Sequence, residues 1–260
     1  MNDTSLPTHG SAPRLYVESA LVAGVAIAAT EGQSHYLLSV MRRGPGGRVA
    51  LFNGRDGEWH ATIDVRTKRQ VTFVVAERLR HQGTEPDLWL MFAPLKAARL
   101  EMMVEKATEL GVSALVPVIT RRTVVNRVNH RRLEAIVMEA AEQCERLTVP
   151  TIAALRPLDM ALGDWPAGEA GQRRLFFLDE GSARDASAPP AMIAMHGASG
   201  RAAILVGPEG GFDPDEQRLL RGLPYVSPLV LGPRILRAET AALAALTCWQ
   251  AAQGDWGRPS

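Results

Sequence analysis

The pattern of apolar and polar positions divides the chain into a β-rich beginning and a longer remainder in which strands and helices alternate. Short apolar runs between Gly- and Asn-rich turns fill residues 14–80, and such runs are typical of strands. We expect a short helix over 34–42. The expected strands of this region are 14–17, 48–52, 58–65 and 70–77.

After the polar segment 81–87, apolar runs of strand length alternate with amphipathic stretches of helical period. This alternation predicts an α/β domain with a mostly parallel sheet covered on both faces. The expected strands are 88–93, 114–119, 175–178, 202–206 and 228–231, and the expected helices are 97–110, 131–147, one capped by Asp213, and 238–252. We therefore predict two domains, residues 1–80 and 88–254, and a flexible loop over 180–201.

Composition narrows the class of protein. The chain is 46% hydrophobic and 22% charged, which is ordinary for a globular protein. No uncharged apolar stretch approaches the ~20 residues that a transmembrane helix needs, and the N-terminus lacks the order of a signal peptide. The two cysteines do not have the spacing of metal ligands. We expect a cytoplasmic protein that uses neither a membrane nor a metal.

The net charge is only +1, but arginine dominates the basic residues, since three of the 29 are lysine. Arginine suits planar, bidentate contact with phosphates and bases. A GC-rich genome would enrich arginine equally well. The candidate RNA contacts are Arg42, Arg43, Arg121, Arg122, Arg127 and Arg146. For Arg146 a partner subunit is the alternative, and for the segment around Arg121 a solvated loop is the alternative.

Two Gly-rich segments, 205–212 and 231–241, say most about function. Each follows an apolar run that predicts a buried strand, and each leads into a helix. The first segment lacks the Gly-Lys-Ser/Thr ending of a phosphate loop, and Pro208 and Glu209 oppose a polyanion. A neutral or cationic ligand is therefore favoured. A tight turn that only needs glycine is the alternative.

The second segment favours a built pocket over a simple turn. A rigid bend at 232–234 precedes Ile235 and Leu236, which can form an apolar wall. Three polar residues, Arg237, Glu239 and Thr240, then begin a helix. Capping of this helix and an ion pair made by Arg237 are the alternative explanation.

The two segments together, Val-Gly-Pro-Glu-Gly-Gly-Phe and Leu-Gly-Pro-Arg-Ile-Leu-Arg-Ala-Glu-Thr-Ala, resemble the RsmE family of 16S rRNA (uracil-N3)-methyltransferases, within the SPOUT class. Similar stretches upstream extend the resemblance over residues 14–252. It implies an N-terminal PUA-like β-barrel and a C-terminal SPOUT domain with a deep trefoil knot. It also implies a homodimer that uses S-adenosylmethionine on a uridine in the decoding region of 16S rRNA, within the small ribosomal subunit.

The resemblance further implies that three loops bind the cofactor. The residues expected to bind it are Leu178, Val206, Gly207, Pro208, Glu209, Gly211, Leu231, Gly232, Ile235, Leu236, Arg237, Thr240 and Ala241. Methyl transfer to uridine N3 requires that this nitrogen loses its proton. Arg237 is the expected stabiliser of the uracil charge, and Glu239 or Glu209 is the expected proton acceptor.

Two other functions fit the same sequence. A SPOUT ribose 2′-O-methyltransferase acting on tRNA or rRNA would keep the fold and change the target atom. A non-catalytic RNA-binding protein would keep the pocket only for folding.

Overall fold

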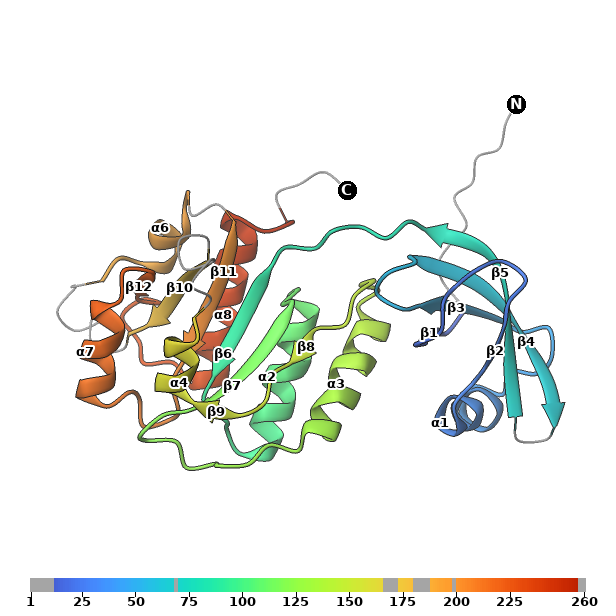
Figure 1. Cartoon of the computed structure of the whole chain (residues 1–260), viewed down its shortest axis with the longest axis horizontal. Helices are drawn as coiled ribbons and strands as arrows, with labels where there is room; N and C mark the ends of the chain where they lie inside the picture. The colour runs from blue at the N-terminus through green and yellow to red at the C-terminus, as the bar shows by residue number, and fades with distance from the viewer. Residues whose placement is uncertain (1–11, 68–69, 166–172, 180–187, 198–199, 257–260) are drawn as a thin grey trace. The chain divides into compact units, whose positions relative to one another are not determined.

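The computed structural model describes residues 12–67, 70–165, 173–179, 188–197 and 200–256. The chain divides into two units, Met1–Thr84 and Glu85–Ser260. The division falls inside the polar segment 81–87, where the hydrophobic pattern changes from strands alone to alternating strands and helices. Figure 1 shows the elements of both units in chain order.

The first unit is a five-stranded sheet with the order β1-β3-β4-β5-β2. Its strands are β1 (Arg14–Tyr16), β2 (Ala26–Ala28), β3 (Arg48–Phe52), β4 (Glu58–Thr67) and β5 (Gln70–Arg80). The pair β1–β3 is parallel and the other pairs are antiparallel. Leu51, Ile63 and Phe73 belong to its buried core. In the part that the structure describes, β1 and β2 are edges, so the expected barrel is a half-barrel.

The helix expected over 34–42 is two short helices. Thr30 caps α1 (Glu31–His35) in a reciprocal capping box with Gln33. The chain continues as a π-helix, η1 (Tyr36–Val40), which is an uncommon conformation. The π-helix ends at Val40, and two residues later Arg42 has a φ of 52°, in the left-handed region. The Arg43 N–H donates to the Leu37 carbonyl at 2.8 Å.

The second unit contains a sheet with the order β12-β10-β11-β6-β7-β8, and β9 also pairs with β7. All of its pairings are parallel. The strands are β6 (Leu88–Phe92), β7 (Ala114–Ile119), β8 (Thr151–Ile152), β9 (Arg156–Pro157), β10 (Arg173–Leu178), β11 (Arg201–Val206) and β12 (Val226–Leu229). The parallel sheet predicted from the alternating pattern is confirmed.

Helices cover both faces of this sheet. They are α2 (Ala97–Glu109), α3 (His130–Gln143), α4 (Leu158–Gly163), α6 (Ala191–Met195), α7 (Pro214–Gly222) and α8 (Ala238–Ala252). One core cluster packs α2, α3, α6 and α8 against the sheet, and a second cluster packs α4 and α7 against the opposite side. The Asp213–Glu216 capping box expected at the start of α7 is present.

Three expectations for this unit need correction. Helix α3 ends at Gln143 rather than at 147, because Glu145 takes a left-handed φ of 61°. Strand β12 ends at Leu229, two residues before the expected end. The expected loop over 180–201 contains α6, although 180–187 and 198–199 lie outside the described residues. The trefoil knot stays a prediction.

Candidate functional site

A pocket opens at the carboxyl ends of β10, β11 and β12, where parallel sheets commonly hold ligands. Its cavity volume is about 420 Å³. The lining residues are Arg122, Leu178, Asp179, Val206, Gly207, Gly210, Gly211, Phe212, Gln217, Leu229, Val230, Leu231, Gly232, Pro233, Arg234, Ile235, Leu236, Ala238 and Ala241. Both Gly-rich segments therefore contribute to one pocket.

Two glycines of the wall are required by local geometry. A Cβ on Gly207 would lie 2.7 Å from the ring of Phe212, so only glycine lets this ring pack under the first loop. Gly232 has a φ of 97°, a conformation that residues with a side chain rarely adopt. These positions shape both loops around the cavity.

The wall combines an apolar surface with a few polar groups, which is typical of small-molecule sites. Leu178, Val206 and Leu236 supply apolar surface. Asp179 is a buried lining residue at the end of β10, and its carboxylate accepts from the Arg221 Nε at 2.8 Å. Arg221 extends from α7, so this pair joins the end of β10 to the helix that follows the first Gly-rich loop.

The structure brings together most of the expected cofactor residues. Those on the pocket wall are Leu178, Val206, Gly207, Gly211, Leu231, Gly232, Ile235, Leu236 and Ala241. Pro208, Glu209, Arg237 and Thr240 do not line it. Asp179 and Arg234 also line it; they lie in the loops that the resemblance implies, at 175–180 and 232–241, although neither is singled out from the sequence. Gln217 lines it from outside those loops, and no sequence signal indicates it.

The two expected proton acceptors do not line the pocket. Arg99, near the start of α2, lies between them, with its Nη1 3.6 Å from the Glu209 Oε1 and its Nε 3.8 Å from the Glu239 Oε1. The Glu239 side chain is only 7% exposed, and its Oε2 accepts no hydrogen bond in the described structure. Neither carboxylate lines the pocket and both lie near Arg99, a position that does not favour the expected role of proton acceptor, which stays a prediction.

Arg237 is exposed at the N-cap position of α8. Its backbone carbonyl accepts from the Ala241 N–H at 2.8 Å, as the first hydrogen bond of the helix requires. Within the described part of the chain its side chain makes no hydrogen bond or ion pair. Leu236 and Ala238 on either side of it do line the pocket. Arg237 is thus next to lining residues in the chain but does not itself line the pocket.

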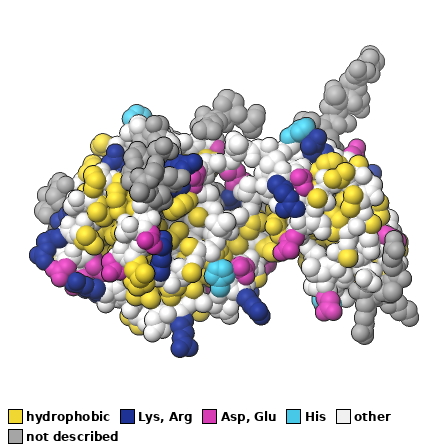
Figure 2. Space-filling view, in the orientation of Figure 1, with side chains coloured by type: hydrophobic (Ala, Val, Ile, Leu, Met, Phe, Trp, Pro, Cys, Tyr) yellow, Lys and Arg dark blue, Asp and Glu magenta, His cyan; other side chains and the backbone are white. Residues whose placement is uncertain are grey.

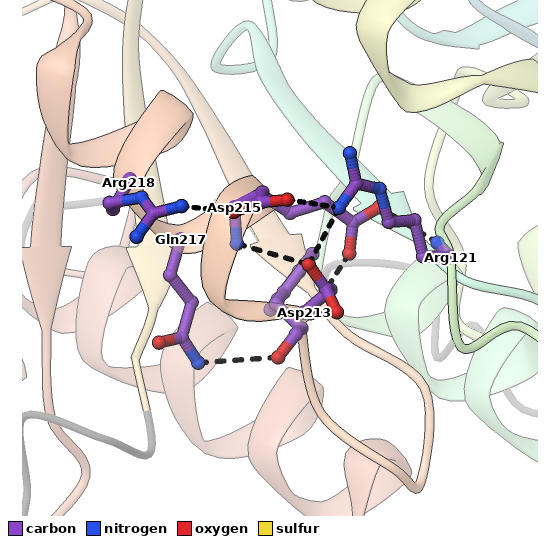
Figure 3. Close-up of polar contacts among 7 residues, drawn as sticks. Arg121, Asp213, Asp215, Gln217 and Arg218 are labelled. Carbon is purple, nitrogen blue, oxygen red and sulfur yellow. Dashed lines mark hydrogen bonds and ion pairs between the residues drawn. The ribbon is translucent and has the colours of Figure 1, made fainter.

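Arg121 and Arg122 follow β7 and have different surroundings. The Arg121 Nη1 donates to Asp213 at 2.8 Å and to Asp215 at 2.6 Å, and Figure 3 shows this contact with the start of α7. These carboxylates raise the pKa of Arg121 through hydrogen bonds. The Arg122 Nη1 instead donates to the Gly210 carbonyl at 2.9 Å, and Arg122 lines the pocket.

Arg146 is a correction to the expected RNA contacts. Its side chain is 8% exposed, and it pairs with Glu85. It also donates to the carbonyls of Thr108, at 2.7 Å, and Val112, at 3.0 Å. A guanidinium committed to buried partners in its own chain is a structural group rather than a phosphate contact.

The other expected RNA contacts remain on the surface. Arg42 and Arg127 are exposed, and Arg43 is half-buried. On the face in Figure 2, basic and acidic side chains are interspersed rather than gathered into one field.

In the described residues no helix is long and apolar enough to span a bilayer. Within those same ranges no cluster of three His, Cys, Asp or Glu side chains is suited to a metal.

Comparison with protein families gives two matches. The profile of an RNA methyltransferase domain matches residues 83–250. The profile of an RNA methyltransferase PUA domain matches residues 29–76. The PUA profile lies within the first structural unit and the methyltransferase profile covers most of the second, beginning at residue 83, and together they span most of the chain.

Individual relatives agree with these matches. The chain is 33% identical over 234 residues to the ribosomal RNA small subunit methyltransferase E of Rickettsia conorii, covering 90% of this chain and 93% of the relative. The corresponding enzyme of Synechocystis is 30% identical over 236 residues, covering 90% of this chain and 75% of that one.

Solved structures resemble the whole chain. One is the ribosomal RNA small subunit methyltransferase E of Neisseria gonorrhoeae bound to S-adenosylmethionine, with a TM-score of 0.81 and 27% identity, covering 95% of this chain and all of that one. Another is a Legionella pneumophila methyltransferase in complex with the same cofactor, with a TM-score of 0.81 and 30% identity, covering 94% and 99%. The chain belongs to the ribosomal RNA small subunit methyltransferase E family of RNA methyltransferases.

Proposed function

We propose that the protein transfers a methyl group from S-adenosylmethionine to N3 of a uridine in the decoding region of 16S rRNA. The observation that carries the proposal is the pocket at 178–241, to which both Gly-rich segments contribute in a chain of this family. The similar structures from N. gonorrhoeae and L. pneumophila contain S-adenosylmethionine.

The residues of the pocket fit this cofactor. Its apolar residues, among them Leu178, Leu231 and Leu236, can pack against an adenine ring, and the Gly-rich backbone lets amide groups approach a ribose. The first Gly-rich loop lacks the Gly-Lys-Ser/Thr ending of a phosphate loop, and Arg122 and Arg234 are the cations of the described lining, so a sulfonium with an amino acid group is favoured over a polyphosphate. When bound, the cofactor supplies an electrophilic methyl group.

Balanced methyl transfer breaks one S–C bond, forms one N–C bond and releases the proton of uridine N3. Glu209 and Glu239 turn toward Arg99, so we assign this proton to solvent water rather than to either carboxylate. The task that remains for the protein is to stabilise the negative charge that spreads onto the uracil oxygens as N3 ionises.

RNA binding by the smaller unit is the second part of the proposal. A PUA domain profile matches this unit, and Arg42 is exposed two residues after its π-helix. Phosphate contacts of this kind weaken steeply with added salt. We infer that an assembled small subunit, rather than free rRNA, is the substrate, and methylation of purified subunits against naked rRNA tests this choice.

The active form that we propose is a homodimer in the cytoplasm. Large apolar side chains are exposed near the pocket, with Ile235 72% exposed and Ile193 68% exposed. Helix α6, which carries Ile193, packs against α8 and β12. Sedimentation analysis of the wild type and of an Ile235→Glu variant tests the dimer, because a monomeric wild type would contradict it.

Mass spectrometry of rRNA from a deletion strain tests the activity. Loss of one N3-methyluridine from the small-subunit rRNA, restored by the wild-type gene, is the expected result. Loss of a ribose 2′-O-methyl group would identify the enzyme as a ribose methyltransferase. An unchanged set of modifications in all RNAs would identify a non-catalytic RNA-binding protein.

A further inference from the structure

Arg121 and Arg122 occupy the middle of a tight turn that is held from several sides. The Thr123 N–H donates to the Thr120 carbonyl at 3.1 Å, and the Thr120 N–H donates to the Thr123 Oγ1 at 2.8 Å. The Arg121 N–H donates to Glu216 of α7 at 2.8 Å. The residue before Arg122 is therefore bonded to α7, the helix that follows the first Gly-rich loop, and Figure 3 shows Arg121 against the start of that helix.

The side chain of Arg122 lies along this Gly-rich loop. Its Nη1 donates to the Gly210 carbonyl at 2.9 Å, and a Cβ on Gly210 would lie 3.6 Å from the Cβ of Arg122. One of the five guanidinium N–H donors is thereby used. The turn and the loop together hold the guanidinium at the pocket wall.

The charge of Arg122 is not neutralised by a neighbour. Arg121 pairs with Asp213 and Asp215, whereas no carboxylate pairs with Arg122 in the described part of the chain. Adjacent residues of one turn thus differ in kind: one cation is neutralised in a contact with α7, and the other is open to the pocket. An arginine stays charged at any accessible pH.

Arg234 is the other guanidinium of the pocket wall, and it is the weaker choice for stabilising charge. It is exposed in the second Gly-rich loop, where no side-chain hydrogen bond holds it to a described residue. A group that is already fixed in place stabilises developing charge better, because it does not have to reorganise during the reaction. The hydrogen bond to Gly210 gives Arg122 this advantage.

We propose that Arg122 is a catalytic residue that contacts the uracil oxygens and stabilises the anion formed when N3 loses its proton. The inference rests on the proposed function and replaces Arg237 with Arg122 in the role of charge stabiliser. A fixed positive charge favours the anionic form of a neighbouring group and so lowers the pKa of N3. The N3 proton passes to water, and the methyl group then bonds to the vacated nitrogen.

The test uses full-length protein and small subunits from a strain that lacks this enzyme. Arg122→Ala, Arg122→Lys and the matched control Arg121→Ala are compared with wild type. Single-turnover methylation is measured with saturating S-adenosylmethionine and saturating subunits from pH 6.5 to pH 9.5, and cofactor affinity is measured separately by calorimetry. Arg121→Ala removes the neighbouring cation while the Arg121 N–H remains bonded to Glu216.

Arg122→Ala should lower the saturated rate at neutral pH by about 100-fold, the loss typical of removing one donor to a developing oxyanion. The deficit should shrink toward pH 9.5, because more of the uracil ionises unaided. Arg122→Lys should recover part of the rate. The cofactor Kd should stay within about threefold of wild type in every variant. Arg121→Ala removes an expected RNA contact, so it should raise only the KM for subunits and keep a saturated rate within the same range.

Three outcomes would overturn the inference. A normal saturated rate with a higher, salt-dependent KM would make Arg122 a phosphate contact. An equal loss in Arg121→Ala would mean that the turn matters only as structure. An equal loss of cofactor affinity would mean that Arg122 only shapes the loop. A wild-type protein that forms no N3-methyluridine would instead sink the proposed function, and the inference with it.

Discussion

The two ends of the parallel sheet use charge in opposite ways. At the amino ends of β6, β10 and β11, Asp87 pairs with Arg173 at 2.5 Å and with Arg201 at 3.4 Å. At the carboxyl ends, Arg122 and Arg234 line a cavity and have no carboxylate partner in the described structure. Ligand sites of such sheets form at the carboxyl ends.

The amino end is closed around Arg173, whereas Asp87 and Arg201 are 36% and 43% exposed. The Arg173 side chain is 1% exposed, and its guanidinium lies 3.7 Å from the centre of the Trp89 ring. Buried charges persist when their partners are fixed, and removing one partner leaves the other uncompensated. The carboxyl end also holds a partnered arginine, Arg221 on Asp179, so the contrast lies in Arg122 and Arg234, which have no carboxylate partner in the described structure. We infer that partnered arginines serve stability and unpartnered ones at the cavity serve function.

The largest expected effect is at the closed end. Asp87→Asn removes the carboxylate charge that faces buried Arg173 and keeps the size of the side chain. We expect it to lower the free energy of unfolding by about 3 kcal/mol, because the guanidinium stays buried without its counter-ion. Urea denaturation followed by circular dichroism measures the change.

The exposed pair Arg156–Asp164 supplies the control for that change, with side chains 38% and 68% exposed. Asp164→Asn should alter stability by less than about 1 kcal/mol, as is usual for surface ion pairs. An equal loss of unfolding free energy in Asp87→Asn and Asp164→Asn would contradict the distinction between the pair of buried Arg173 and an exposed ion pair.

The next effect belongs to the open end. Gly232→Ala must place a side chain at a φ of 97°, although no atom lies within 4 Å of the added Cβ. Strain rather than a clash then shifts the loop, and we expect about tenfold weaker binding of S-adenosylmethionine by calorimetry. Gly222→Ala at the end of α7 also meets no atom within 4 Å, and its cofactor affinity should match wild type.

The sequence pattern predicted the pocket at the carboxyl ends of the strands better than the ion pairs at their amino ends. Strands β3 and β7 and helix α8 have the bounds that their apolar runs predicted. Strands β8 and β9 have two residues each, too few for a readable pattern. Glycines with special geometry indicated the pocket, because a backbone conformation that requires glycine is set by residues close by in the sequence. Arg99 was missed because its link to Glu209 and Glu239 exists only after the chain folds.

Arginine in the sequence does not by itself separate the two uses of charge. Arg146 and Arg122 were both expected to contact RNA, yet Arg146 pairs with Glu85, 61 residues before it. Only the fold shows which cation finds a carboxylate. The prediction of RNA contacts from arginine-rich segments therefore fails wherever a distant acid completes an ion pair.

The Asp87–Arg173 pair at the amino ends of the strands should also contribute less stability in acid. Burial alone would raise the pKa of Asp87, but its hydrogen bond with Arg173 and that residue's charge outweigh burial, so the pKa is lowered. A lowered carboxyl pKa contributes stability above the unfolded value of about 3.9 and loses it as the pH falls through the folded pKa. Wild type should lose stability below about pH 4 more steeply than Asp87→Asn. Parallel stability curves for the two proteins would contradict this assignment.

Arg42, in the smaller unit, tests whether an exposed arginine serves function, and its expected effect is the smallest. It holds a φ of 52° at a helix end, a position that glycine occupies at lower cost. Arg42→Gly should therefore raise the free energy of unfolding by about 0.5–1 kcal/mol, which urea denaturation can detect.

If the exposed guanidinium contacts RNA, Arg42→Gly should also weaken subunit binding and reduce the slope of log affinity against log salt by about one. Arg48→Gly in exposed β-strand backbone is the control, because it also removes an exposed cation but should not gain stability. If Arg42→Gly gains stability and binds subunits normally, this arginine has no part in function although it is exposed.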